Sequence, residues 1–409
     1  MADKETLAPL VDRIVELAAL PEQAEKKKLW ADHQALKGTD RVPLCVYYEG
    51  IPGRQWEAMF GLDYIQCRDG LAASIEADLR KRIWMAENVD DDHIVWPTAV
   101  IHVPSIEKQG WGVDLGWKHS QDDLGANGYD VPFKDGIDMS QLTRPQTEWD
   151  DTAITAHLDR AAELTGDRLT VLSAYQTANH APFDLAVNMR GMQDLLMDVV
   201  LDPAKVHELM EFITAASVAH NQQREAEGRI NALSSEPGLQ EYGFRVHCAY
   251  LPNDHETRPP ELKDEWIYVS AQTAAGLGPD HYAEFVQPYN DRIAGPYTHQ
   301  TVYYHGCERL DHKAEIIKNL PNLRRFHVSP WSSVSKAVEV FRGSVVMEVH
   351  DHPGNTFLKS DADQETHLRE LVQQAEGNPL DLNISDVHSF NDDPQNLIRW
   401  AANARRAAE

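Results

Sequence analysis

The sequence predicts an α/β protein built as a single (β/α)8 TIM barrel, on three observations. Short runs rich in β-branched and aromatic residues alternate with amphipathic stretches along most of the 409 residues. Repeated strand–helix units favour parallel strands joined by crossover helices. The chain has no Gly/Ser-rich linker and no break in composition, which favours one barrel over two doubly wound domains.

The elements follow in chain order. Residues 1–40 predict an N-terminal helical extension, because apolar residues recur there at helix spacing: Leu7, Leu10, Val11, Ile14, Leu17 and Ala18. The barrel is predicted over residues 41–409. Its strands are expected at Val42–Tyr48, His93–Val103, Leu169–Tyr175, Thr301–Tyr304, Arg325–Val328, Ser344–Val349 and Leu380–Ile384. Helices are expected at Met192–Val200, Pro203–Ala219, Pro279–Ala294, His312–Leu320, Ser333–Phe341 and Asp363–Gln374.

Residues 105–150 depart from this alternation. They are rich in Gly, Asp and Trp and have little apolar periodicity. We expect a long insertion near the barrel mouth, where the loops after the strands carry function.

Composition narrows the possible partners. The formal net charge of −27 argues against binding to nucleic acid or to anionic membrane lipid, both of which require positive surface. Four cysteines do not form a disulfide framework, and neither a leader segment nor a long apolar run is present. We therefore expect a soluble cytoplasmic protein with a small-molecule substrate and thiol or thiolate cysteines.

Reactive side chains gather where the predicted strands of the C-terminal half end. Four successive strand ends carry imidazoles, carboxylates and one thiol: His305 and Cys307, then His327, then Glu348, His350, Asp351 and His352, then Asp386 and His388. In a parallel barrel these ends meet at one mouth, which is where reactive residues lie.

His305 and Cys307 are two positions apart, so in an extended segment their side chains point the same way. Imidazole and thiolate suit zinc, and a catalytic zinc site uses three protein ligands. Asp386 or His388, at the last strand end, is the expected third ligand. The alternative is that His305 is a buried polar residue and Cys307 an inert core cysteine.

Glu348 and His350 are candidates for acid–base catalysis or for orienting the ligands, although residues 350–352 also fit a polar turn before Pro353. The remaining cysteines are interpreted as structural: Cys45, Cys67 and the Cys248 that follows His247. The sequence contains no nucleotide-binding GxGxxG or GxxxxGK[ST] motif and no GxSxG elbow.

Several of these stretches together resemble the uroporphyrinogen decarboxylase superfamily, in order over about residues 40–405. They are HAPFDLAVNMRG at 180–191, DPAKVHELM at 202–210, GPDHYAEFVQPY at 278–289, YHGC at 304–307 and DPQNL at 393–397. The resemblance implies a (β/α)8 barrel that either decarboxylates porphyrinogens or transfers methyl groups from a corrinoid.

The sequence departs from the decarboxylases at three positions. Residues 46–54 hold a single Arg, residues 96–98 lack the catalytic Asp, and Asn188 replaces the active-site Tyr. The thiol methyltransferases resemble it more closely, since they carry His-x-Cys where this chain has His305 and Cys307. Their later Cys corresponds to Asp386, with His388 two residues on.

The resulting hypothesis is a cobalamin-linked methyltransferase, in which zinc or another divalent metal binds an acceptor thiol. The resemblance also implies a corrinoid substrate, free or carried by a corrinoid protein, and a homodimer is compatible with the barrel. Two alternatives remain open at this stage. One is a lyase acting on a small carboxylate or tetrapyrrole, and the other is a non-catalytic corrinoid- or tetrapyrrole-binding barrel.

Overall fold

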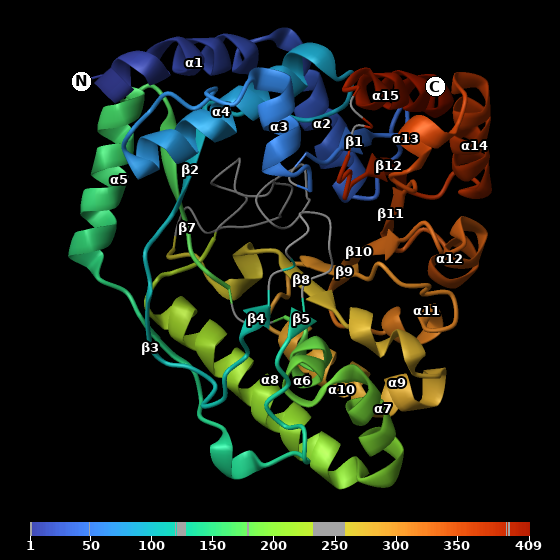
Figure 1. Ribbon diagram of the computed structural model, residues 1–409. Coiled ribbons are helices and arrows are strands. Elements are labelled where there is room, and N and C mark those ends of the chain that lie inside the picture. Colours follow the sequence, from blue (N-terminus) through green and yellow to red (C-terminus); the bar gives the residue numbers. More distant parts are fainter. Residues whose placement is uncertain are drawn as a thin grey trace.

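The computed structural model describes residues 2–48, 50–118, 120, 128–177, 180–231, 258–389, 391 and 393–409 (Figure 1). The helices are α1 (Ala2–Ala18), α2 (Pro21–Gln34), α3 (Gly53–Phe60), α4 (Gly70–Asn88), α5 (Asp151–Thr165), α6 (Pro182–Arg190), α7 (Met192–Leu201), α8 (Pro203–Ala226), α9 (Pro279–Phe285), α10 (Gln287–Ala294), α11 (Ala314–Ile317), α12 (Val334–Phe341), α13 (Asn355–Leu358), α14 (Asp361–Gln374) and α15 (Gln395–Ala408). Short 3-10 helices are η1 (Met139–Gln141), η4 (Leu262–Asp264) and η5 (Gln272–Gly276).

The strands are β1 (Leu44–Val46), β2 (Thr98–His102), β3 (Ile106–Gln109), β4 (Trp117–Lys118), β5 (Gly128–Tyr129), β6 (Gln146–Glu148), β7 (Thr170–Ala174), β8 (Ile267–Ser270), β9 (Val302–His305), β10 (Leu323–Val328), β11 (Val346–His350) and β12 (Leu380–Ile384). A parallel six-stranded sheet has the order β1-β12-β11-β10-β9-β8, and β2 pairs with β7 in a parallel two-stranded sheet. Helices connect the parallel strands, so the predicted α/β class is confirmed.

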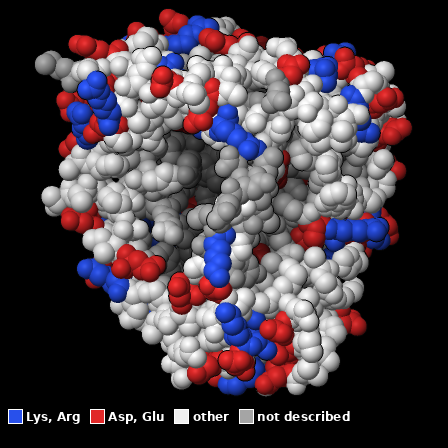
Figure 2. Space-filling view, in the orientation of Figure 1, with Lys and Arg blue, Asp and Glu red and all other residues white. Residues whose placement is uncertain are grey.

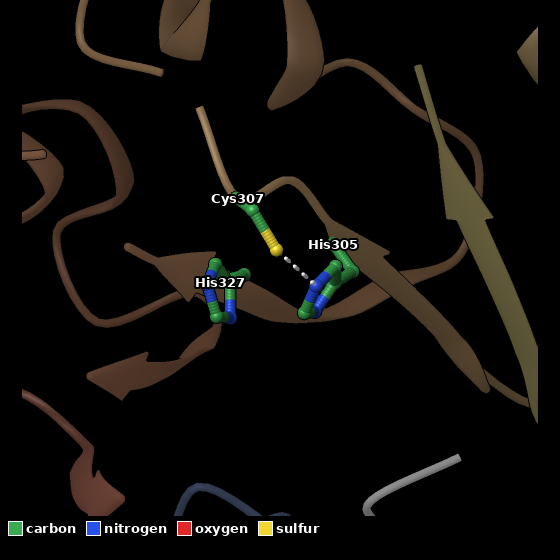
Figure 3. Close-up of side chains that lie close together, drawn as sticks. All are labelled: His305, Cys307 and His327. Atoms are coloured by element: carbon green, nitrogen blue, oxygen red, sulfur yellow. Dashed lines mark hydrogen bonds between the residues drawn. The ribbon is translucent and has the colours of Figure 1, made fainter. Parts of the chain in front are cut away.

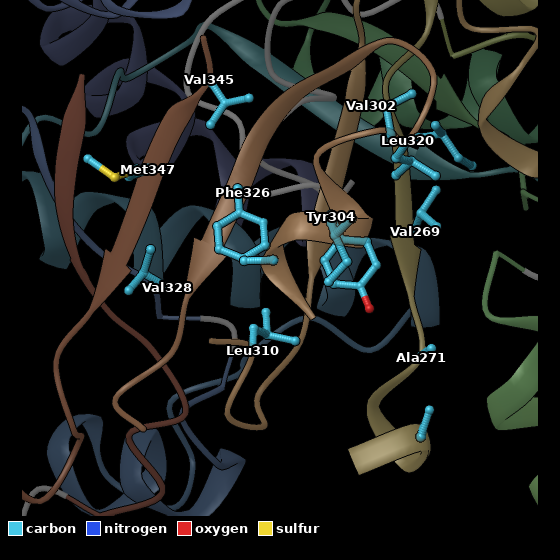
Figure 4. Packing of buried hydrophobic residues seen from close by; sticks show 14 of the residues in the cluster. Val269, Ala271, Val302, Tyr304, Leu310, Leu320, Phe326, Val328, Val345 and Met347 are labelled. Atoms are coloured by element: carbon cyan, nitrogen blue, oxygen red, sulfur yellow. The ribbon is translucent and has the colours of Figure 1, made fainter. Parts of the chain in front are cut away.

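One face of the six-stranded sheet is apolar. Alternate strand residues point to it, and they belong to the main hydrophobic cluster of the described residues: Leu44, Val46, Ile267, Val269, Val302, Tyr304, Phe326, Val328, Met347, Val349, Leu380, Leu382 and Ile384 (Figure 4). The same cluster includes residues of the surrounding helices, such as Ile317 of α11 and Phe341 of α12. Burial of these apolar side chains stabilises the packing of the sheet against the helices.

The opposite face is also buried but polar. The residues on this face include Tyr47, just after β1, and the intervening strand residues Cys45, Tyr303, His305, Arg325, His327, Glu348, His350, Asp381 and Asn383, none of them more than 5% exposed. Because buried polar groups require partners, this face is held by hydrogen bonds and ion pairs. It contains the candidate site.

The helical pattern predicted for residues 1–40 is confirmed. Leu7, Val11, Ile14 and Leu17 of α1 are buried, and they pack in a second cluster with residues of α4 and α5 (Figure 1). Among the helices of the described ranges, none is both long enough and apolar enough to cross a membrane. The separation of residues 1–40 from a barrel over 41–409 stays a prediction.

Several element boundaries differ from those predicted. Pro279–Ala294 is two helices, broken at Val286, because Pro288 has no N–H to donate within a continuous helix. Strand β8 was not among the predicted strands. The segment 105–150 forms two antiparallel pairs, β3 with β6 and β4 with β5, while residues 119 and 121–127 lie outside the described residues.

Candidate metal centre and its surroundings

The ends of β9 and β10 bring three metal-type ligands together (Figure 3). His305 Nε2 lies 3.2 Å from Cys307 Sγ, and a ring nitrogen of His327 lies within 4.8 Å of ligand atoms of both residues. His305 and His327 are buried, whereas Cys307, in the turn after β9, is exposed. Two imidazoles and one thiolate therefore surround one point that solvent reaches from one side.

The register of the sheet explains this convergence. Tyr304 pairs with Phe326 across β9 and β10, and both side chains point to the apolar face. The next residue on each strand, His305 and His327, therefore points to the polar face. Their ring centroids are 4.1 Å apart.

Each imidazole is oriented by a second group. His305 Nδ1 lies 2.7 Å from the Tyr303 hydroxyl, and His327 Nδ1 lies 2.9 Å from Glu348 Oε2. A contact at one ring nitrogen fixes the orientation of the ring and leaves the other ring nitrogen to act as a metal ligand. Tyr303 also donates a hydrogen bond to Glu348, so the two supports are connected.

Glu348 is the centre of this network and is fully buried. Its Oε1 accepts a hydrogen bond from Tyr47 at 3.1 Å and lies 3.4 Å from Arg325 Nη2. Burial raises the pKa of the Glu348 carboxyl, but the adjacent imidazoles of His350 and His327, with Arg325, outweigh this and hold the pKa well below its ordinary value. Glu348 is thus an anion in the folded protein.

His350 lies at the end of β11, and its ring stacks on Tyr47 at 5.8 Å between centroids. Its Nδ1 is 3.0 Å from the Ser385 hydroxyl. Its Nε2 is buried and lies 3.3 Å from Glu348 Oε2. His350 therefore faces the same carboxylate oxygen as His327, and the two rings lie 4.4 Å apart between centroids.

Below Glu348, a buried ion pair anchors the polar face. Arg325 donates two hydrogen bonds to Asp381, at 2.9 and 3.0 Å, and His33 of α2 lies 2.8 Å from the same carboxylate. Burial raises the pKa of Asp381, yet Arg325 and His33 together lower it to about 2. This bidentate pair fixes the Arg325 guanidinium beside Glu348.

A cavity of about 570 Å³ lies next to Tyr268, whose ring contacts His180 in the cavity lining. His180 and Asp184 line it, together with Trp111, Asn188 and His220. The His180 ring meets Tyr268 edge-on at 4.7 Å, and Tyr268 in turn lies 4.9 Å from the His305 ring. Tyr268 thus separates the cavity from the ligand cluster.

The face shown in Figure 2 is hollowed. Basic side chains border the hollow, and many of the other charged side chains lie toward the periphery of this face.

Comparison with solved structures shows similarity to a methyltransferase from Methanosarcina mazei. The two share a fold at a TM-score of 0.53 and 11% sequence identity, and the alignment covers 93% of this chain and 98% of that chain. No family model and no curated protein sequence matches this chain.

The structure brings together four of the residues that the sequence singled out, namely His305, Cys307, Glu348 and His350. Asp386 and His388 belong to none of the three groups of metal-type ligands found among the described residues. The Asp386 carboxylate accepts a hydrogen bond from Ser385 at 3.2 Å, and its backbone packs against Gly50, where an added Cβ would lie 3.0 Å from it.

Sequence reasoning placed His327 on a strand but did not select it as a ligand. The signal was present, since His305 and His327 hold the same alternate position on consecutive strands. Of the cysteines predicted to be structural, Cys45 and Cys67 are buried, and the pair of His247 and Cys248 lies outside the described residues.

Proposed function

We propose that the chain is a (β/α)8 barrel of the uroporphyrinogen decarboxylase superfamily. In a barrel of this kind the eight strands β1, β2 and β7–β12 would stand side by side in chain order. The sheet β1-β12-β11-β10-β9-β8 and the pair β2-β7 would then be neighbours at two places, β1 beside β2 and β7 beside β8. Contacts at both places support this. The Asp92 N–H donates to Leu44 O at 2.9 Å, and Trp266 beside β8 packs with Leu172 and Ala174 of β7.

We further propose that this barrel transfers a methyl group from a corrinoid to a small thiol at the His305–Cys307–His327 cluster. That three-residue cluster is the observation that carries the proposal. The donor set fits zinc, because two imidazoles and one thiolate are zinc's preferred ligand types and a catalytic site keeps its fourth position for substrate. The exposed side of Cys307 is where a substrate would approach.

A bound zinc ion would lower the pKa of the acceptor thiol, so that a nucleophilic thiolate persists at neutral pH. The protein's own residues prepare that position. Tyr303 and Glu348 hold the rings of His305 and His327, and Arg325 keeps Glu348 ionised and in place. Glu348 therefore acts in this proposal as a positioning residue, and His350 is the nearest imidazole that could take up a proton.

The substrates are proposed from the same geometry. The cavity lined by His180 and Asp184 is large enough for a small-molecule acceptor, and the Tyr268 ring contacts the rings of both His180 and His305. The methyl donor would be a methylated corrinoid, free or carried by a corrinoid protein. The fold similarity to the methyltransferase from Methanosarcina mazei supports this reaction class over a binding-only role.

The assay measures methyl transfer from methylcobalamin to a panel of small thiols. The loss of the methylcobalamin absorbance reports the rate of transfer. The wild-type protein loaded with zinc should demethylate the cobalamin in a thiol-dependent manner. Cys307→Ser should lower the rate at least 100-fold, while the matched control Cys67→Ser, a buried cysteine in another cluster, should retain it.

Two results would contradict the proposal. One is equal activity in the wild type and in Cys307→Ser. The other is release of carbon dioxide from uroporphyrinogen without any thiol-dependent methyl transfer, which would place the chain with the lyases.

A further inference from the structure

A second group of metal-type ligands lies apart from the His305–Cys307–His327 cluster. Cys45 in β1, Asp91 and His93 are all buried, with 0%, 3% and 9% of each residue exposed. One ligand atom from each residue lies within 4.8 Å of the other two. Asp91 and His93 belong to the segment that leads from α4 into β2, so the group spans two separate parts of the chain.

The three ligand atoms contact one another pairwise. His93 Nδ1 lies 3.0 Å from Cys45 Sγ and 2.7 Å from Asp91 Oδ2, and the sulfur lies 3.8 Å from the same carboxylate oxygen. An imidazole nitrogen carries at most one proton, which points along a single direction in the ring plane. A cation at the centre of the three atoms would satisfy the sulfur, the nitrogen and the oxygen at once.

The separations are close to those that a tetrahedral ion requires. Zinc binds sulfur at about 2.3 Å and nitrogen or oxygen at about 2.0 Å, which places sulfur and nitrogen about 3.5 Å apart and nitrogen and oxygen about 3.3 Å apart. The observed separations differ from these values by about half an ångström. Small side-chain rotations, without any backbone change, would accommodate the ion.

Charge points in the same direction. A thiolate and a carboxylate buried side by side are costly unless positive charge compensates them. The His93 ring lies 2.7 Å from the Asp91 carboxylate, and the Lys26 ammonium of α2 donates to the backbone carbonyl of His93 at 3.2 Å. A divalent ion would balance the two negative charges directly.

The position of the group gives such an ion a structural task. β1 and β2 belong to different sheets, and no β-ladder joins them in the described residues. Asp91 already accepts a hydrogen bond from the backbone N–H of Val46 at 2.9 Å, and the His93 N–H donates to Asp91 Oδ1 at 3.1 Å. An ion here would add coordinate bonds across the seam between β1 and the approach to β2.

We propose that Cys45, Asp91 and His93 bind one zinc-type divalent cation that fastens β1 to the segment preceding β2. The mixed sulfur, nitrogen and oxygen donors suit zinc or cobalt better than magnesium or calcium, which prefer oxygen alone. Burial of all three ligands places the ion inside the fold, and its fourth coordination position would be left for a water molecule. The inference does not depend on the proposed methyltransferase activity.

The test uses the fact that the chain has four cysteines. The full-length variant Cys67→Ser, Cys248→Ser, Cys307→Ser keeps Cys45 alone. Loaded with cobalt(II), it should show a thiolate-to-cobalt charge-transfer band in the near ultraviolet and bind one tightly held ion per chain. Adding Cys45→Ser as the fourth change should remove both the band and the ion.

The result that overturns the proposal is a folded Cys45-only variant without a charge-transfer band. A band that survives Asp91→Ala and His93→Ala in this background would equally overturn it. The outcome is separable from the proposed function, because Cys307→Ser alone reports on the mouth cluster. If that cluster binds no metal, Cys307→Ser leaves the metal content of the wild type unchanged, whereas Cys45→Ser still lowers it by one ion per chain.

Discussion

The two faces of the six-stranded sheet differ in what holds them together. On one face Phe326, Met347 and Leu382 pack with helices through apolar contact, which is nondirectional and tolerates adjustment. On the other face Arg325, Glu348 and Asp381 are equally buried but depend on hydrogen bonds and charge pairing. Adjacent residues of one strand therefore contribute in different ways: the apolar face to stability, and the polar face to the placement of the site.

The largest effect on folding should come from breaking the polar face at its ion pair. Asp381→Ala leaves Arg325 buried without its bidentate partner, and we expect it to lower the free energy of unfolding by about 3–5 kcal/mol. Chemical denaturation measures the change. The exposed pair of Lys28 and Asp32 is the control, since Asp32→Ala should lower the free energy of unfolding much less than Asp381→Ala does. Equal losses of unfolding free energy in the two variants would show that the buried ion pair contributes no more to stability than the exposed pair.

A cavity on the apolar face should cost slightly less and leave the site intact. Leu382 is 1% exposed, and Leu382→Ala should lower the free energy of unfolding by about 2–5 kcal/mol. The number of metal ions bound per folded chain should stay that of the wild type. Loss of metal from the folded variant would show that packing on the apolar face also determines the placement of the metal ligands on the polar face.

Acid should weaken the polar face selectively. The pKa of Asp381 is lowered from 3.8 to about 2, so its contribution to stability is fully present above about pH 4 and is lost as the pH falls toward 2. The shift corresponds to about 2 kcal/mol. The stability difference between the wild type and Asp381→Asn should therefore narrow by that amount over this range. A difference independent of pH would mean that Asp381 is not held ionised by Arg325 and His33.

The smallest expected effect lies at the metal centre. Glu348→Gln keeps the shape of the side chain but removes the charge that holds His327, and we expect zinc affinity at the mouth cluster to fall about 10- to 100-fold. Competition with a chromophoric chelator measures this affinity. Glu365→Gln, at a surface carboxylate paired with Arg369 and Arg406, provides the matched control. Unchanged zinc affinity in Glu348→Gln would show that the Glu348 charge does not hold His327 in place for metal binding.

Much of the fold followed from local pattern. The α/β class and the positions of β1, β7, β9, β10, β11 and β12 were predictable because runs of β-branched and aromatic residues pack on a pleated sheet. β8 was missed because Ile267–Ser270 is short and follows the charged stretch at 261–265. The break at Val286 depended on one residue, Pro288, inside an otherwise helical pattern.

The site was predictable in part. His305 and Cys307 stand close together in sequence, so their proximity needed only an extended backbone. His327 and Glu348 reach the same point through the register of β9, β10 and β11, which local pattern does not reveal. Cys45 shows the same limit. Its apolar neighbours in sequence suggested packing, whereas Asp91 and His93 reach it from 46 and 48 residues away.

The most direct test of the central claim is the metal content of His327→Ala compared with Asp386→Ala. Both proteins would be purified without chelator, and zinc per chain would be measured by elemental analysis, with folding checked by circular dichroism. If His305, Cys307 and His327 form the centre, His327→Ala loses one ion per chain relative to the wild type and Asp386→Ala loses none. Loss of the ion in Asp386→Ala, with full retention in His327→Ala, would contradict the account and place the third ligand on the last strand.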